Sequence, residues 1–327
     1  MSSARTLDAM ARTAEPTLAR ASPARIWFVL GTVYVVWSTT FIGIKVTNET
    51  MPAMIAGGVR FLIAGAVLLP IALAHGDRRG DRPGKQEWRG AALVGLLLIF
   101  GGNGGIVWAE RTIPSGLAGL AIATVPLWIA LIDLVALGRR QPRVAVVGLL
   151  VGFLGAALLV GGSALEGRID VGGLLVALAA AASWAVGSVY QRHARLPRRA
   201  FVGAGMQMLI ASAAFFAAGA LAGEIGLFEP SAFSRASVLA LAYLVVVGSW
   251  IGFTSYLWLL RNTRISLVAT YAYVTPVGAV LLGSLLLDEP LTVSTLVAGG
   301  MIVLAVALIV SSGGASATEE PIPPEIT

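Results

Sequence analysis

The chain has 327 residues, of which 57% are hydrophobic and 12% are charged. Soluble domains carry about twice that charged fraction, so this composition excludes an ordinary soluble enzyme and indicates an integral membrane protein. The formal net charge is +6, but the basic residues lie in short loops between apolar segments. This pattern reports membrane topology and predicts no nucleic-acid partner.

The sequence has no cysteine and only two histidines, His75 and His193, which lie far apart beside basic loops. Disulfides and thiolate sites are therefore excluded. There is no nucleotide-binding loop, no metal-ligand spacing, and no combination of Ser, His and Asp with a plausible geometry inside a membrane. The sequence predicts no metal, no cofactor and no enzymatic activity.

Apolar segments follow one another along almost the whole chain. Residues 1–25 are polar and weakly periodic, which predicts a disordered cytoplasmic tail, and the first apolar run is long enough to be an uncleaved span. A span needs about 20 mainly apolar residues. Ten segments qualify as predicted transmembrane helices: 26–46, 54–74, 88–108, 115–137, 144–161, 171–191, 201–222, 237–259, 266–287 and 292–311. Residues 312–327 predict a second disordered cytoplasmic tail.

The distribution of Lys and Arg predicts the orientation of these segments. With the amino terminus inside, 18 of the 23 Lys and Arg residues fall on the inner tail and inner loops. Basic loops stay on the cytoplasmic side, so both termini are predicted to be cytoplasmic. We expect a multi-pass protein of the cell inner membrane.

The chain contains an internal repeat in which residues 107–160 return, loosely, as residues 257–310. The matched positions in this register are Trp108, Arg111, Leu117, Pro126, Leu137 and Val160 with Trp258, Arg261, Leu267, Pro276, Leu287 and Val310. The basic loop 138–143 aligns with the acidic Asp288 and Glu289, so the copies are expected to lie upside down relative to each other. The sequence predicts an all-α membrane protein of two inverted five-helix repeats, residues 26–161 and 171–311, with a substrate site between them.

Several segments resemble the EamA-type transporters of the drug/metabolite transporter superfamily. The segments that carry this resemblance are YVVWSTTF at 34–41, VRFL at 59–62, IPSGLA at 113–118, and the TP and DEPLT motifs at 275–276 and 288–292. The resemblance covers about residues 26–311 and implies two inverted EamA units, a central cavity and alternating access. Members export amino acids, other metabolites or toxic compounds, and amino-acid exporters of the YddG type are the most similar among them.

Two tryptophans are candidates for the wall of that cavity. Trp37 and Trp184 lie near the middle of the first and sixth segments, at matching repeat positions. Thr40 shares a helix face with Trp37, and Ser188 shares one with Trp184. The functional interpretation is an aromatic and hydroxyl-lined substrate site, and the alternative is ordinary helix packing. Trp250 is a further candidate, because the eighth segment also carries hydroxyl and aromatic side chains.

The third segment contains a run of four glycines around one amide. Asn103 is expected to face a partner or a watery cavity, because a polar amide at membrane depth needs one. Gly102 and Gly105 are candidate hinge or gating positions, with a tight helix-packing seam as the alternative. The ninth segment adds Tyr271 as a candidate substrate-binding residue. The sequence does not decide which faces of the eighth and ninth segments look inward.

Two prolines and one deep arginine complete the candidates. Pro126 and Pro276 are equivalent in the repeat and predict paired hinges, with static kinks as the alternative. Arg60 lies inside the second segment, but its repeat counterpart is Gln207. We therefore expect a structural role for Arg60, paired with Glu49 or Glu110, rather than a role in binding.

The middle of every predicted span lacks a carboxylate, which disfavours proton-coupled export of cations. Small multidrug exporters of the superfamily use a glutamate in their first helix, where this chain has the residues of Trp37 to Thr40. A nearly neutral, aromatic-lined cavity suits uncharged or zwitterionic solutes.

The predicted function is an inner-membrane secondary transporter that exports amino acids, aromatic or other neutral ones among them, or similar small metabolites. The alternatives are a polyspecific exporter of drugs or toxic compounds, and a channel or scaffold that does not transport. The expected partners are a small-molecule substrate and membrane lipid. One chain suffices to enclose a site, and a dimer remains compatible with the sequence.

Overall fold

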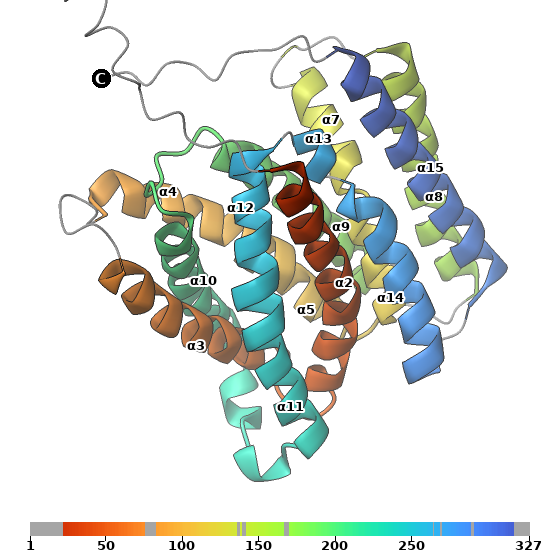
Figure 1. Ribbon diagram of the computed structural model, residues 1–327. Helices are drawn as coiled ribbons and strands as arrows, with labels where there is room; N and C mark the ends of the chain where they lie inside the picture. Colours follow the sequence, from red (N-terminus) through yellow and green to blue (C-terminus); the bar gives the residue numbers. More distant parts are fainter. Residues whose placement is uncertain are drawn as a thin grey trace, which may run out of the picture.

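The computed structural model describes residues 22–75, 83–135, 142–166, 170–263, 265–268, 270–288 and 291–316, together with Gly138. Within these ranges every regular element is a helix and no strand occurs, so the all-α prediction is confirmed. Figure 1 shows the helices packed side by side, with the start of α2 and the end of α15 at the same end of the molecule.

The helices follow the predicted segments closely. The first repeat contains α2 (Pro23–Asn48), α3 (Ala53–Ala74), α4 (Lys85–Gly95), the π-helix η1 (Leu96–Gly104), α5 (Gly105–Ala109), α6 (Ser115–Ile122), α7 (Val125–Val135) and α8 (Arg143–Glu166). The second repeat contains α9 (Val171–Gln191), α10 (Ala200–Leu221), the 3₁₀ turns η2 (Glu224–Leu227) and η3 (Pro230–Ala232), α11 (Arg235–Tyr243), the π-helix η4 (Leu244–Phe253), α12 (Thr254–Asn262), α13 (Ile265–Val268), α14 (Tyr271–Leu287) and α15 (Val293–Ser316). Most of the two predicted tails lies outside the described residues.

Seven helical stretches among the described residues are long and apolar enough to cross a membrane. They are Pro23–Asn48, Ala53–Ala74, Lys85–Ala109, Ser115–Ile132, Val171–Gln191, Ala200–Leu221 and Arg235–Asn262. Three shorter apolar helices, Arg143–Gly155, Val274–Leu287 and Val293–Ala305, coincide with the fifth, ninth and tenth predicted segments. The structure thus supports a multi-pass membrane protein, and the number of ten crossings stays a prediction.

The third and eighth predicted segments each contain a π-helical stretch that the sequence did not suggest. Helix η1 spans residues 96–104 and η4 spans residues 244–253. In the register that aligns residue 107 with residue 257, these two stretches occupy nearly the same repeat positions. π-Helical segments are rare and are frequently found at functional sites. Their matched placement marks these two helices as a feature shared by both halves.

The two equivalent prolines lie in different local structures. Pro126 is the second residue of α7, directly after a break between α6 and α7. A proline is well tolerated in the first turn of a helix, because the missing N–H has no intrahelical acceptor there. Pro276 instead lies inside the continuous helix α14. Of the two prolines predicted to lie in the middle of a helix, only Pro276 does so, and Pro126 lies in the first turn of α7.

Equivalent helices of the two repeats pack against each other in opposite directions. Helix α3 packs along α10, with Gly219 facing Ile55 and Gly205 facing Leu69. Residue numbers fall along α10 as they rise along α3, so the two helices are antiparallel.

The same relation holds for α8 and α15, the last helices of the two repeats. Gly152 faces Ala305, and Gly155 faces Met301. Antiparallel pairing of sequence-equivalent helices is the arrangement that a pair of inverted repeats requires.

A side chain of the second repeat also caps a helix of the first. The carboxylate of Glu224 accepts hydrogen bonds from the backbone N–H groups of Met54 (2.8 Å) and Ile55 (3.1 Å) at the start of α3. The first N–H groups of a helix have no intrahelical acceptor and carry partial positive charge, so a carboxylate stabilises this end. Arg111 lies 3.8 Å from the other carboxylate oxygen.

Candidate substrate-binding cavity

A cavity of ≈ 60 Å³ lies between the two repeats. About 10–15 Å³ of such space holds one water molecule, so the cavity as seen admits a few waters. Its wall comes from α2, α3, η1, α5 and α6 of the first repeat and from α9, η4 and α14 of the second. The lining residues are Trp37, Thr40, Phe41, Ile44, Arg60, Phe61, Ile99, Gly102, Asn103, Ile106, Ile122, Trp184, Gly248, Phe253, Tyr271 and Thr275.

Four aromatic rings from four different helices meet at one side of this cavity. Trp37 of α2 lies edge-on to Trp184 of α9, with ring centroids 5.4 Å apart, and edge-on to Tyr271 of α14 at 4.7 Å. Tyr256 of α12 completes the group at 4.9 Å from Trp37 and 5.4 Å from Trp184. Such aromatic pairs contribute about 0.5–1.5 kcal/mol each beyond the burial of their area. We call these four residues the aromatic cluster.

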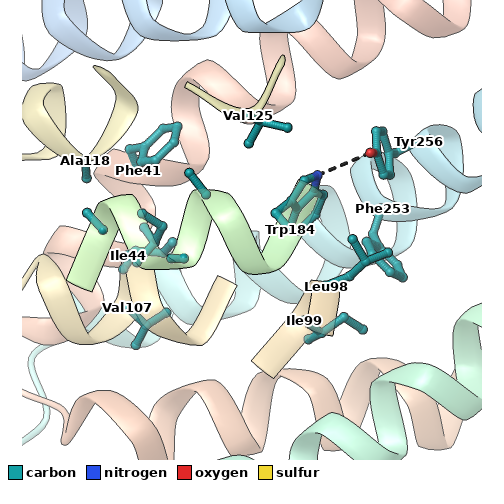
Figure 2. Close-up of a cluster of buried hydrophobic side chains, with 14 of the residues drawn as sticks. Phe41, Ile44, Leu98, Ile99, Val107, Ala118, Val125, Trp184, Phe253 and Tyr256 are labelled. Carbon is teal, nitrogen blue, oxygen red and sulfur yellow. Dashed lines mark hydrogen bonds between the residues drawn. The ribbon is translucent and has the colours of Figure 1, made fainter. Parts of the chain in front are cut away.

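A closed ring of hydrogen bonds fixes the orientation of Trp184. Its indole N–H donates to the hydroxyl of Tyr256 at 3.2 Å, as Figure 2 shows. The hydroxyl of Ser188 donates to the backbone carbonyl of Trp184 at 2.7 Å and lies 2.8 Å from the Tyr256 hydroxyl. Because the Ser188 proton is directed to that carbonyl, Tyr256 donates to Ser188. All three side chains are buried. Ser188 therefore holds two members of the cluster in place without lining the cavity.

Each of the two central tryptophans packs against a glycine of the opposite repeat. A Cβ atom on Gly102 of η1 would lie 2.7 Å from the ring of Trp184. A Cβ atom on Gly252 of η4 would lie 3.0 Å from the indole nitrogen of Trp37. Gly102 and Gly252 are themselves equivalent in the repeat, as Trp37 and Trp184 are. The two glycines therefore permit the same close approach of ring and backbone in both halves.

Polar atoms line the cavity between the aromatic cluster and α3. Thr40 is bonded to its own helix, because its hydroxyl donates to the carbonyl of Trp37 at 2.9 Å. Thr275 lines the cavity, and its buried hydroxyl has no hydrogen-bond partner in the described part of the chain. The hydroxyl of Tyr271 likewise lacks a well-aligned partner there, since the nearby Trp184 indole N–H donates to Tyr256. These two hydroxyls are available to a bound molecule.

Arg60 also lines the cavity, which corrects the expectation of a nearly neutral site. Its side chain is 3% exposed. Its Nε donates to the Ser249 hydroxyl at 3.0 Å, and Nη1 donates to the Asn103 side-chain oxygen at 3.4 Å. The proposed pairing with Glu49 or Glu110 is not among its contacts. The arginine extends from α3 to both π-helices, so it connects the first repeat with the second.

The structure separates the predicted site residues into two groups. Those that line the cavity are Trp37, Thr40, Gly102, Asn103, Trp184 and Tyr271. Those that do not line it are Gly105, Pro126, Ser188, Trp250 and Pro276. Trp250 is directed to α3 instead, where its indole N–H donates to the carbonyl of Ala64 at 3.0 Å. Gly105 packs against Ala180, as a helix-packing seam would. For the residues of both groups, the assignment as binding or hinge residues stays a prediction.

The predicted site residues did not include Arg60, Phe253 or Thr275, which line the cavity. Phe253 and not Trp250 faces the cavity. Both residues lie in the π-helix η4, whose hydrogen bonds from residue i to i+5 change which residues share a face. The sequence had left the inward face of this segment undecided. For Arg60, the available signal was the rarity of an intramembrane arginine. Comparison with its neutral repeat counterpart favours a structural role, and that role stays a prediction.

Comparison with known proteins identifies the family. The model of the EamA-like transporter family matches residues 24–161 and, a second time, residues 171–311. The chain belongs to the EamA-like transporter family. The two matched ranges coincide with the two predicted repeats, and they include every residue of the cavity wall.

Relatives of known sequence are membrane transporters by name. The chain is 37% identical over 278 residues to the uncharacterized inner membrane transporter YedA of Escherichia coli (strain K12), covering 85% of this chain and 88% of the relative. It is 27% identical over 273 residues to a probable amino-acid metabolite efflux pump of the same strain, covering 80% and 86%. A solved crystal structure with 25% sequence identity aligns at a TM-score of 0.60, covering 90% of this chain and all of the other.

These findings indicate a transporter of the drug/metabolite superfamily rather than an enzyme, and a multi-pass protein of the inner membrane.

Proposed function

We propose that this EamA-like transporter exports amino acids or similar small metabolites from the cytoplasm by alternating access through the central cavity. The carrying observation is that the two central tryptophans of the cavity wall occupy equivalent positions in two antiparallel repeats. Trp37 and Trp184 correspond to each other, and so do the glycines on which they pack. Rocking one repeat against the other would open such a site to each side in turn. The name of one relative, a probable amino-acid metabolite efflux pump, supports the substrate class.

The chemistry of the wall suits a small solute with both polar and apolar parts. Aromatic rings offer apolar surface and can attract an ammonium group. The hydroxyls of Tyr271 and Thr275 can accept or donate a hydrogen bond. A cavity of ≈ 60 Å³ has room for about four to six waters on the scale used above, the size of a small amino acid, so loading of a larger solute requires the repeats to move apart.

The proposal includes the topology predicted from the sequence. The chain crosses the inner membrane ten times, with both termini in the cytoplasm and residues 1–25 and 312–327 as disordered tails. The partners are the substrate and membrane lipid. One chain encloses the site, and a dimer is compatible with it. Since the predicted spans lack a central carboxylate, we propose facilitated export down the substrate gradient.

Counterflow in proteoliposomes tests this function directly. Purified protein is reconstituted with a high internal concentration of one compound, and uptake of the labelled compound is followed for amino acids, purines, sugars and organic cations. A carrier of amino acids shows uptake that depends on internal amino acid and is unchanged when a proton gradient is imposed. Exchange restricted to organic cations would favour the polyspecific drug exporter. Flux without stimulation from inside indicates a channel, and no flux indicates a scaffold.

Replacement of the central tryptophans tests the cavity assignment. Trp37→Ala and Trp184→Ala each remove a ring with several aromatic contacts, each worth about 0.5–1.5 kcal/mol. Exchange should fall about tenfold or more, since 1.4 kcal/mol corresponds to a factor of ten. Trp27→Ala is the matched control, because Trp27 lies on α2 but is 58% exposed and does not line the cavity. Wild-type exchange rates in both cavity variants, with normal membrane insertion, would overturn the assignment.

A further inference from the structure

The arginine in the cavity wall has no negatively charged partner among the described residues. Arg60 donates to two neutral oxygens, the Ser249 hydroxyl and the Asn103 amide. Its guanidinium carbon lies 4.6 Å from the centre of the Phe61 ring. The ion pair of Arg111 with Glu224 lies away from the cavity wall.

A buried guanidinium in this setting is energetically incomplete. Removing a full charge from water is costly, and neutral hydrogen-bond acceptors offset only part of the cost. A guanidinium has five N–H donors, and two acceptors leave the others available. The Nη2 atom lies beside Gly248, a cavity-lining position with no side chain of its own. Both residues line the cavity, so the donors that remain lie at the cavity wall.

Arg60 also stands where the central cavity meets a second, smaller void. That void has a volume of ≈ 10 Å³, room for about one water. It is lined by the end of α2, the start of α3, Val107 and residues around Leu244. The central cavity is lined by the middle of the same helices. Arg60 and Ile44 line both spaces. Trp37 lies at one end of the central cavity, and the Arg60 guanidinium lies at the other end, where the smaller void begins.

The repeat counterpart shows that helix connection alone does not need a charge here. Gln207 occupies the position equivalent to Arg60 on α10 and is 1% exposed. It reaches a neighbouring helix with a neutral side chain, because its amide nitrogen donates to the Gln191 side-chain oxygen at 3.2 Å. Gln207 does not line the cavity. The charge is thus present at the one of the two equivalent positions that faces the cavity.

We propose that Arg60 binds the carboxylate of the transported solute, so that the substrates are small carboxylates such as amino acids rather than amines, sugars or neutral amides. This inference rests on the proposed function. Arginine suits the task because its planar fork forms two parallel hydrogen bonds with a carboxylate. The ammonium group or the side chain of the solute then faces the aromatic cluster. Asn103 and Ser249 hold the guanidinium in place.

The first experiment compares acids with their uncharged relatives on the wild-type protein. Purified protein is titrated with all common amino acids, and ligands are found by the rise in the midpoint of thermal unfolding. For each ligand, the corresponding amide, amine and des-amino acid are measured in the same way, followed by counterflow. The acids and the des-amino acids should stabilise the protein, and the amides and amines should not. Equal stabilisation by acids and amides would overturn the role of Arg60, even where counterflow supports export.

The second experiment changes the residue. Arg60→Gln should raise the half-saturating concentration of an acid about 10- to 100-fold, the effect of losing one or two hydrogen bonds to a charged group. Arg60→Lys keeps the charge without the fork and should fall between. Gln207→Met is the control at the equivalent position outside the cavity. If Arg60 is purely structural, its replacement will lower the thermal midpoint of the free protein and leave the ratio of acid to amide binding unchanged.

The two proposals fail in different ways. Binding of acids that depends on Arg60, but without counterflow, supports the carboxylate site and contradicts export. Counterflow of compounds without a carboxylate supports a transporter and contradicts the carboxylate site. If Arg60→Gln fails to fold, the acid and amide series on the wild-type protein still decides. If no amino acid or des-amino acid raises the thermal midpoint, the role of Arg60 is refuted.

Discussion

The two repeats agree at the aromatic cluster and differ at the arginine. Trp37 and Trp184 are equivalent, and each packs on a glycine of the other repeat. Arg60 and Gln207 are also equivalent, yet one lines the cavity and the other is buried in a helix contact. In the two proposals, the duplicated architecture and the specificity therefore reside in different residues. The matched residues serve the motion of the two halves, and the unmatched Arg60 serves the binding of the substrate.

The largest loss of stability and of exchange is expected when one methyl group is added at either of the matched glycines. Gly102→Ala and Gly252→Ala place a Cβ at 2.7 Å from the Trp184 ring and at 3.0 Å from Trp37. Overpacking of this kind typically costs about 1–3 kcal/mol. We expect both variants to unfold at lower temperature and to lose exchange, and Gly102→Ala to be the more affected. Thermal unfolding in detergent and counterflow measure the two effects.

Gly31→Ala is the control for these variants. Gly31 lies in α2, and a Cβ atom there would meet nothing within 4 Å. Alanine is the better helix former, so this change should be neutral or slightly stabilising. If Gly31→Ala and Gly102→Ala behave alike, then close packing of Trp184 is not the reason for the glycine.

An effect no larger than this is expected from the hydrogen bond that the indole of Trp184 makes and that, within the described ranges, the indole of Trp37 does not make. Tyr256→Phe removes the hydroxyl that accepts from Trp184 and donates to Ser188. It leaves a buried indole N–H without an acceptor, which costs about 1–3 kcal/mol. Ser188→Ala leaves the bond between Trp184 and Tyr256 intact but removes the acceptor of the buried Tyr256 hydroxyl, so it should cost a comparable amount. Thermal unfolding should place both variants below the wild type, and wild-type stability in both would contradict the hydrogen-bonded ring.

The sequence predicted the helices well, because long apolar runs and the positions of Arg and Lys are strong signals. It also identified Trp37 and Trp184, since tryptophan is rare enough that a match between repeats is informative. It placed Ser188 beside Trp184 on one helix face, which is true, but it could not show that Tyr256 covers the hydroxyl. That contact joins residues 68 positions apart in sequence.

The sequence could not place side chains where local geometry departs from an ordinary α-helix. In η4 the π-helical register directs Trp250 to α3 and brings Phe253 to the cavity. No local sequence pattern predicted the π-helix. The position of Arg60 in the cavity wall was missed for another reason. Its burial depends on contacts with Asn103 of η1 and Ser249 of η4, and periodicity within one segment cannot anticipate contacts among three helices.

The smallest predicted effect comes from the caps of the first helices of the two repeats. Helix α2 is capped by the neutral Ser22, and α9 is capped by Asp170. Asp170 accepts from the Thr112 hydroxyl at 2.8 Å and from the backbone N–H groups of Gly172 and Gly173. These hydrogen bonds, that of Thr112 foremost, lower the pKa of Asp170. The equivalent helix ends should therefore differ in their response to acid.

A lowered pKa in the folded state means that the ionised cap stabilises the protein at neutral pH. This contribution is complete above the ordinary aspartate pKa of about 3.9 and is lost as pH falls through the lower, folded value. The thermal midpoints of wild type and Asp170→Asn should therefore differ by a constant amount between about pH 7 and pH 5. The difference should shrink below about pH 4. Ser22→Ala should show a difference that does not change with pH. If the difference for Asp170→Asn also stays constant below that pH, the carboxylate does not stabilise α9 through its charge.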